Sequence, residues 1–293
     1  MKNPKINPIH TSLIVILLLV SALETGCKTA SKDSRLPENT ALSDDQALIR
    51  YETKGSGDAT LFFIHCWSCD RRYWDNQFDL FSKYFRVVRI DLAGHGESTS
   101  SRKNYTIQKF AHDVEAVIAK LKLDNVILIG HSMGGPVAVQ TALDTPDAIA
   151  GIIAVDSFET AFKWPKTKNE ITALTKPFKT DFRNTTARMV RSMFKPDANP
   201  QLVRQIANDM STAPSAVANS ALTELVYWMS DYPQFKQKLR VPLYHINAKP
   251  EQSVPSNNNQ TIYIDHVGHF IPQAAPASFN GALEQTVAKI LGL

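Results

Sequence analysis

The stretch Asn125–Val139, NVILIGHSMGGPVAV, decides the fold. Its apolar run Val126–Ile129 leads into a glycine-rich turn, and a second apolar run follows at once. This order predicts a buried strand, a sharp turn and a helix. Gly130 and Gly134 flank Ser132 at the G-x-S-x-G spacing, in which small neighbours leave room for a serine on a strained turn. Ser132 is therefore the candidate nucleophile, beside a helix N-terminus that favours developing negative charge.

The same alternation of strand and helix continues on both sides of this stretch. This alternation supports the interpretation of Ser132 as a nucleophile, because a glycine-rich loop without catalytic function can contain the same motif. Apolar runs of strand length occupy residues 60–64, 86–90, 151–155, 241–246 and 261–264, an edge strand is predicted over 48–52, and helical spacing marks 72–83, 107–121 and 278–291, with Ser278 as a predicted N-cap. The pattern predicts an α/β fold with a mostly parallel central sheet and helices on both faces.

Residues 158–239 interrupt the strand pattern. They combine helical stripes with frequent prolines and several aromatic residues, and strands resume only afterwards. This segment is predicted to be a helical lid inserted into the sheet domain, which as a whole should span residues 46–293. A lid over the carboxyl ends of the strands is where an apolar substrate pocket would be built.

The composition favours one large domain and no nucleic-acid partner. The chain has 293 residues, is 43% hydrophobic and carries a net charge of +4, enough for a full core and too little charge for a strongly basic surface. Lys163, Lys166 and Lys168 are interpreted as a solvated face because no dense basic block exists.

The N-terminus has the pattern of an export signal. Lys2 and Lys5 precede an apolar run, Leu13–Val20, and a small-residue region that ends at Cys27. The apolar run is short for a spanning helix, which needs roughly 20 residues. We therefore expect export, in a bacterium to the cell envelope, followed by a flexible tether over residues 28–45.

Cys27 is a candidate for lipidation. The pair Gly26–Cys27 resembles the end of a bacterial lipobox, whose cysteine is lipidated and becomes the mature N-terminus. Glu24 departs from that motif, so ordinary signal cleavage and an uncleaved anchor stay open as alternatives. A lipidated Cys27 would attach the protein to a membrane.

Cys66 and Cys69 form a C-x-x-C pair with three possible explanations. The spacing occurs in thioredoxin-like redox pairs and in half of a zinc site, and in an exported protein it can close a small disulfide. No second C-x-x-C or histidine pair completes a zinc site, so we expect no metal. The element order does not suit a thioredoxin-like fold, which favours structural or incidental thiols.

A serine nucleophile needs a base and an acid. A serine hydroxyl reacts poorly until a proton acceptor is placed on it, and that acceptor needs a carboxylate to fix its tautomer. His269 follows the last predicted strand and is the candidate base, with His266 as the alternative. Asp156 and Glu251 each follow a predicted strand, and we favour Asp156 as the acid.

The chain resembles the α/β-hydrolase superfamily, specifically its lidded, esterase-like branch. The likeness is carried in order by HCW at 65–67, DLAGHGES at 91–98, GHSMGG at 130–135 and GH at 268–269, and it covers about residues 46–293. It implies a Ser-His-acid hydrolase with oxyanion donors at the backbone N–H groups of Trp67 and Met133. Cys66 stands where the family usually has glycine.

The resemblance implies a reaction class and leaves its details open. The leading hypothesis is hydrolysis of an ester or related acyl bond of a small-molecule substrate through an acyl-enzyme, without a metal or organic cofactor. Carbon–carbon hydrolases, lactonases and acyltransferases use the same parts, and a catalytically silent, surface-anchored binding protein is the alternative from another class. Asp91, Gly94 and Gly96 are interpreted as structural, and Arg71 and Arg72 as exposed cations at a helix start.

Overall fold

The fold was obtained as a computed structural model, which describes residues 36–99, 102–158, 160, 162–251 and 259–293. The predicted export signal and Cys27 lie outside the described residues, as do residues 28–35 of the predicted tether. Within the described part of the chain, no helix is both long and apolar enough to cross a membrane.

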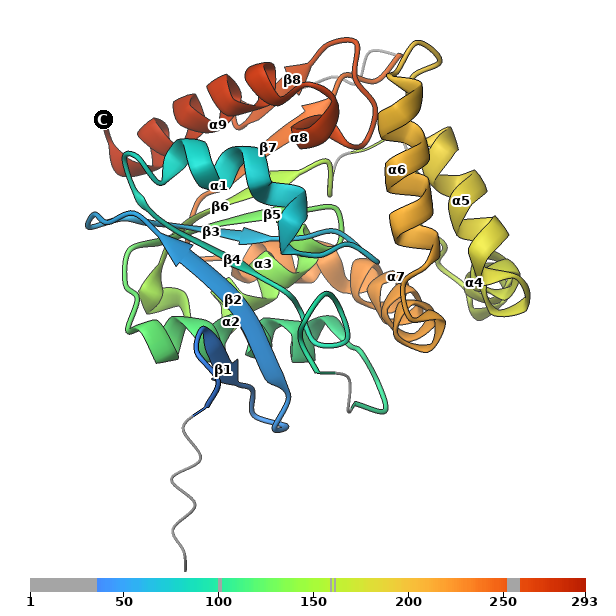
Figure 1. The fold of residues 1–293 in the computed structure, drawn as a ribbon, viewed down its shortest axis with the longest axis horizontal. Coiled ribbons are helices and arrows are strands. Elements are labelled where there is room, and N and C mark those ends of the chain that lie inside the picture. Colours follow the sequence, from blue (N-terminus) through green and yellow to red (C-terminus); the bar gives the residue numbers. More distant parts are fainter. Residues whose placement is uncertain (1–35, 100–101, 159, 161, 252–258) are drawn as a thin grey trace, which may run out of the picture. The chain divides into compact units, whose positions relative to one another are not determined.

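The centre of the fold is an eight-stranded sheet (Figure 1). Its order is β1-β2-β4-β3-β5-β6-β7-β8, and every pair from β4 to β8 is parallel, whereas β1 and β2 are antiparallel to their neighbours. The strands are β1 Thr40–Leu42, β2 Leu48–Lys54, β3 Thr60–Ile64, β4 Arg86–Ile90, β5 Val126–His131, β6 Ile149–Val155, β7 Leu243–Ala248 and β8 Thr261–Ile264. This confirms the predicted α/β fold class.

Helices cover both faces of the sheet, as the apolar strands require. Successive residues of β3 alternate between two cores, with Phe62 packed on the side of α2 and α3 and Phe63 on the side of α1 and α9. The helical segments are η1 Arg71–Trp74, α1 Asp75–Phe81, α2 Ile107–Leu121, α3 Gly134–Asp144, η2 Pro146–Ala148, α4 Lys168–Thr180, α5 Phe182–Ser192, α6 Pro200–Ser211, α7 Ser215–Lys238, α8 Ile271–Ala274 and α9 Pro276–Leu291.

The helical insertion occupies the space between β6 and β7 in the sequence. Four helices, α4 to α7, fill it, and α4 begins at a capping box in which Thr167 and Glu170 each bond the other's backbone. Helices α4 and α5 pack on α7 and α6, and α7 also packs on α3. The insertion thereby rests on the helix that follows Ser132.

Two predicted boundaries are wrong for identifiable reasons. Residues Thr40–Leu42 pair with Leu48–Arg50, so the predicted tether ends before them and β2 is not an edge strand. A strand of three residues is too short to leave a periodic signal in the sequence. Helix α9 begins at Pro276 and not after Ser278, since proline is well suited to the first position of a helix.

Arg71 is also not an exposed cation. Its side chain is 9% exposed and pairs with Asp91, with Glu52 at 2.9 Å and with Glu97 at 2.9 Å. Asp91 also accepts hydrogen bonds from the Arg71 and Glu97 amides, so its structural interpretation agrees with the contacts. Arg72, by contrast, is 71% exposed and pairs with Asp70 at its own helix start.

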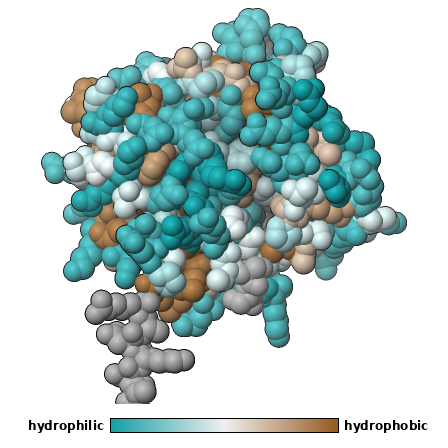
Figure 2. All heavy atoms as spheres, viewed as in Figure 1, coloured by the Kyte–Doolittle hydropathy of each residue, from teal (hydrophilic) through white to brown (hydrophobic). Residues whose placement is uncertain are grey.

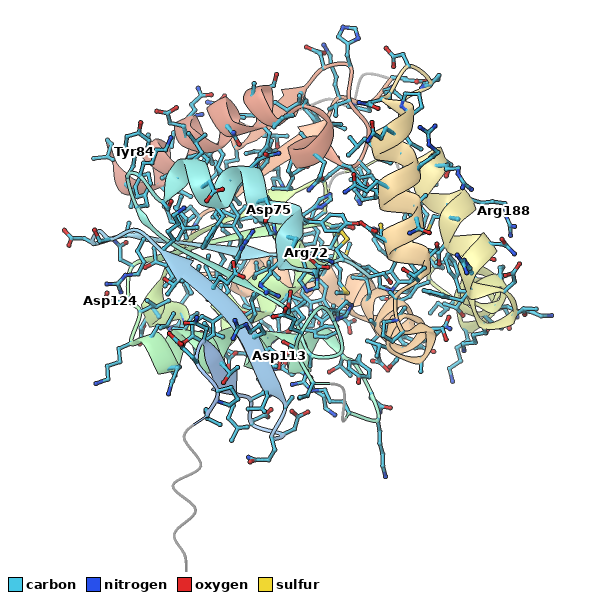
Figure 3. The ribbon with its side chains drawn as sticks, in the orientation of Figure 1. Arg72, Asp75, Tyr84, Asp113, Asp124 and Arg188 are labelled. Atoms are coloured by element: carbon cyan, nitrogen blue, oxygen red, sulfur yellow. A yellow bond between two sulfur atoms is a disulfide. The ribbon has the colours of Figure 1, made fainter. Side chains whose placement is uncertain are left out.

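Polar and charged side chains dominate the viewed surface, with hydrophobic residues scattered among them (Figure 2). Tyr84, which is 72% exposed, and Arg188, on α5, point outward at opposite sides of the same view (Figure 3). The candidate catalytic residues lie instead where the helical insertion meets the sheet.

Candidate active site

Ser132 lies on a strained turn between β5 and α3. Its φ is +53°, a left-handed value that is uncommon for a residue with a side chain. Its amide donates to the Val155 carbonyl at 2.9 Å, which ties the turn to β6. A Cβ at Gly130 would lie 2.1 Å from the Gly134 carbonyl oxygen, and one at Gly134 would lie 2.5 Å from that of Ile64. The two flanking glycines are therefore required for the chain to turn this sharply.

His269 and Asp156 meet at the carboxyl end of the sheet. Asp156 directly follows β6, and its Oδ2 lies 2.6 Å from Nδ1 of His269. The other carboxylate oxygen accepts a hydrogen bond from the Ala248 amide at 3.0 Å. Burial alone would raise the pKa of Asp156, but the hydrogen bond and charge of His269, with the Ala248 amide, hold it below its ordinary value. Asp156 is therefore an ionised carboxylate fixed on two sides.

The backbone of His269 is also held on both sides. Its amide donates to the Met193 carbonyl at 2.9 Å, and its carbonyl oxygen lies 2.9 Å from Nε2 of His131. Burial lowers the pKa of His131 to about 3, so its ring is neutral and donates through Nε2. A Cβ at Gly268 would lie 2.1 Å from the Met193 carbonyl oxygen, which explains that glycine.

Sequence reasoning missed two of these supports. His131 was visible inside the serine motif, and its place next to Ser132 was a usable signal. Met193 gave no signal, because its contact with His269 depends on how α5 meets a loop 76 residues further along the chain.

The alternative acid and base lie elsewhere. The Glu251 side chain is 85% exposed, and its carboxylate lies 3.0 Å from the Lys195 ammonium. His266 is exposed in the turn after β8. Of the two candidate carboxylates, only Asp156 contacts His269 within the described residues.

The candidate oxyanion amides belong to two different loops. Trp67 follows β3, and Met133 is the N-cap of α3. Neither backbone amide donates a hydrogen bond to another described residue, which leaves both as free donors. Cys66 and Cys69 are joined by a disulfide in the first loop.

An apolar cavity of about 440 Å³ joins these elements. Ser132, Asp156 and His269 line it together with Cys66, Trp67 and Met133. The rest of its described wall is mostly methionine, leucine and aromatic side chains from the insertion, such as Met189, Leu225 and Phe178. No lysine or arginine is among the described lining residues. The volume falls within the roughly 300–1,000 Å³ range of small-molecule sites.

One side-chain cluster away from the cavity has the composition of a metal site. His112, Glu115 and Asp144 place their ligand atoms within 4.8 Å of one another, and they are the one such group among the described residues. Burial, and then the charge of Asp144, raise the pKa of Glu115 to about 7. A carboxyl that is buried beside a second carboxylate keeps its proton to a higher pH than an isolated one.

Glu115 should make stability fall with rising pH. The folded pKa of about 7 lies above the ordinary glutamate value of 4.5. Protonated Glu115 therefore contributes stability that is complete below pH 4.5 and is lost as the pH rises through 7. We expect the free energy of unfolding, measured with urea, to fall less between pH 5 and pH 8 in Glu115→Gln than in the wild type. Glu284→Gln, an exposed change on α9, should follow the wild type. An unchanged pH slope in Glu115→Gln would contradict the expectation.

Comparison with known proteins agrees with this architecture. Residues 59–275 match the family described as alpha/beta hydrolase fold. A pimeloyl-[acyl-carrier protein] methyl ester esterase of Wigglesworthia glossinidia brevipalpis is 33% identical over 144 residues, which are 48% of this chain and 54% of that protein. The acetyltransferase component of an acetoin cleaving system of Cupriavidus necator is 31% identical over 136 residues, 46% of this chain and 36% of that protein.

Solved structures agree on the fold. A thermophilic esterase from Thermogutta terrifontis superposes with a TM-score of 0.73 at 21% identity, covering 86% of this chain and 98% of that one. At that sequence identity the similarity supports a shared fold and nothing further. The family match, in contrast, spans most of the chain and includes the serine turn and the His269 loop. The chain therefore belongs to the α/β-hydrolase family.

Proposed function

We propose that this protein is a serine hydrolase that cleaves esters with an uncharged, apolar acyl group. The contact between Asp156 and His269, at the wall of the same cavity as Ser132, is the observation that carries the proposal. Serine, carboxylate and histidine in this chain order, on this fold, are the parts of a Ser-His-acid triad. The esterase relative adds support for ester hydrolysis over part of the chain.

In the proposed reaction, His269 takes the proton from the Ser132 hydroxyl as its oxygen attacks the ester carbonyl. Asp156 holds Nδ1–H of His269, so that Nε2 is left to accept the proton, and it stabilises the imidazolium that forms. The free amides of Trp67 and Met133 donate to the carbonyl oxygen as it becomes negative. His269 then protonates the leaving alcohol, and water attacks the acyl-Ser132 ester by the same route in reverse.

The wall of the cavity supports the choice of acyl group. Methionine, leucine and aromatic side chains gain free energy from burying methylene groups, at about 0.8 kcal/mol for each CH₂. A carboxylate at the end of the acyl chain would lose its water without meeting a cation among the described lining residues. The thioether side chains Met189, Met193 and Met210 adapt to chains of different shape.

A panel of aryl esters tests the function and the acyl preference together. From acetyl to hexanoyl we expect kcat/KM to rise, by up to roughly fourfold for each methylene that enters the cavity. An ester of equal length that ends in a carboxylate should be poorer by on the order of 100-fold. Absence of turnover of every ester would contradict the proposed function, and equal use of the charged ester would contradict the acyl class.

A charge placed in the cavity provides the matched control. Met189→Lys should narrow the gap between the neutral and the carboxylate ester, because Met189 lines the cavity and is only partly buried. Tyr84→Lys adds the same charge at an exposed position outside the cavity lining and should leave the gap unchanged.

A further inference from the structure

The loop between β3 and η1 contains a closed turn beside the cavity. The amide of Cys69 donates to the Cys66 carbonyl at 3.2 Å, and the disulfide joins the same two residues across a Cα separation of 5.3 Å. Between them, Ser68 has a φ of +56°, a left-handed value for a residue with a side chain. The covalent link thus closes a four-residue turn with an unfavourable backbone conformation inside it.

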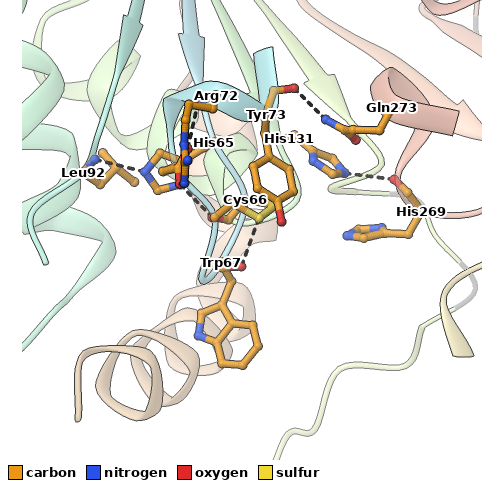
Figure 4. The surroundings of a disulfide bond; sticks show 11 residues. His65, Cys66, Trp67, Arg72, Tyr73, Leu92, His131, His269 and Gln273 are labelled. Atoms are coloured by element: carbon orange, nitrogen blue, oxygen red, sulfur yellow. Dashed lines mark hydrogen bonds and ion pairs between the residues drawn. A yellow bond between two sulfur atoms is a disulfide. The ribbon is translucent and has the colours of Figure 1, made fainter. Parts of the chain in front are cut away.

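The Cys66 carbonyl oxygen has a second donor. Nδ1 of His65 lies 2.7 Å from it, and Nε2 of the same ring lies 3.0 Å from the Leu92 amide (Figure 4). Because an amide can only donate, Nε2 accepts and Nδ1 carries the hydrogen. Burial lowers the pKa of His65 to about 4, so the neutral form with this tautomer persists. The Cys66 carbonyl is therefore held by two N–H groups at once.

That carbonyl shares its peptide unit with the candidate oxyanion amide. A trans peptide is planar, and its C=O and N–H point in opposite directions, so fixing the Cys66 carbonyl fixes the direction of the Trp67 N–H. No cis peptide occurs among the described residues. If the turn opened, this peptide could rotate, and a carbonyl would then point where the donor is needed.

The neighbouring side chain is fixed independently. Nε1 of Trp67 donates to the Ala218 carbonyl on α7 at 2.8 Å, and its ring packs edge-on against Phe178 and Phe182 of the insertion. These contacts fix the indole ring, but they do not fix the orientation of the Cys66–Trp67 peptide. The peptide orientation depends on the two hydrogen bonds to the Cys66 carbonyl, of which the one from the Cys69 amide lies in the turn that the disulfide closes.

We propose that the Cys66–Cys69 disulfide is a positioning element that keeps the Trp67 amide directed at the oxyanion. This inference rests on the proposed function. The cysteines do not react with substrate; they act through the Cys66–Trp67 peptide. A disulfide at this position also agrees with the expected export, since such bonds persist in oxidising compartments.

Thiol counting tests the covalent part first. In full-length Cys27→Ala protein only Cys66 and Cys69 remain, because the chain has three cysteines. Denatured without reductant, this variant should contain no free thiol. Two free thiols per chain would overturn the proposal. Cys27→Ala should otherwise have wild-type kcat and serves as the control for loss of a cysteine.

Kinetics test the positioning. Cys69→Ala and the double variant Cys66→Ala/Cys69→Ala should lose about 10- to 100-fold in kcat, less than the roughly 10²–10³-fold typical of deleting one oxyanion donor. KM for the same neutral ester should change by less than about twofold, because the oxyanion contact strengthens only in the transition state. A disulfide that only stabilises the fold would lower Tm and leave kcat of the folded protein unchanged, and this result would overturn the proposal.

Reduction of the wild type gives a second measurement if those variants fail to fold. Dithiothreitol passes two electrons and two protons to the disulfide, forms its own cyclic disulfide and leaves Cys66 and Cys69 as thiols. The kcat should fall in proportion to the thiols formed and recover on reoxidation. Full kcat after two additional thiols have become titratable would overturn the proposal. If the oxidised wild type hydrolyses no ester, the proposed function has failed and not the positioning.

Discussion

Replacing Ser132 with alanine is expected to lower kcat/KM for aryl esters by on the order of 10⁵- to 10⁶-fold, the size of loss that follows removal of a triad nucleophile. The reason is geometric, since no other described hydroxyl combines the tight turn after β5 with a place beside His269 in the cavity wall. KM should change little, because alanine removes one oxygen and leaves the apolar wall intact.

A fluorophosphonate probe gives the covalent counterpart of this experiment. The Ser132 oxygen should attack phosphorus, fluoride should leave and His269 should take the proton, so that one phosphonyl group is found on the peptide containing Ser132. Ser132→Ala should not be labelled. Ser192→Ala removes another serine that lines the cavity and should keep both labelling and turnover. A folded wild type that takes no label would favour a silent binding protein.

Asp156→Asn should lower kcat by about 10⁴-fold, as the equivalent change does when it leaves the histidine in the wrong tautomer. Oδ1 of Asp156 accepts from the Ala248 amide, so an asparagine would keep its oxygen there and turn its NH₂ toward His269. Two donors cannot face each other, and Nδ1 of His269 would become the acceptor. Its Nε2 would then carry the hydrogen and could not take a proton from Ser132.

Glu251→Gln is the matched control for this change. Its carboxylate is exposed and lies beside Lys195, so kcat should stay within about twofold of the wild type, the small effect of losing an exposed ion pair. A severe loss in Glu251→Gln with normal activity in Asp156→Asn would overturn the choice of acid. Tm of both variants shows whether either loss reflects unfolding.

The sequence predicts best what is set by local rules. The strand before Ser132 and the full extent of α2 follow from short-range apolar spacing. The approach of Asp156 to His269 follows from topology, because the carboxyl ends of parallel strands share one edge. These features needed no knowledge of side-chain packing.

What the sequence does not predict depends on contacts between distant segments. Arg71 was expected in solvent from its neighbours alone, yet its partners come from β2 and from the loop after β4. The C-x-x-C spacing of Cys66 and Cys69 is the same in a pair of free thiols and in a disulfide. Only the folded turn, which brings the two side chains together, distinguishes a disulfide from free thiols. The contact of Met193 with His269 requires knowing where the helical insertion ends on the sheet.

The contact between Met193 and His269 limits how a substrate can enter. Since Gly268 and the His269 amide lie directly against the carboxyl end of α5, lifting that end would break the 2.9 Å hydrogen bond and displace the base. We therefore expect any movement of the insertion that admits substrate to leave Met193 in place. If His269 acts as the proposed base, an opening that lifted Met193 would displace it, whereas an opening elsewhere in the insertion would leave it in place.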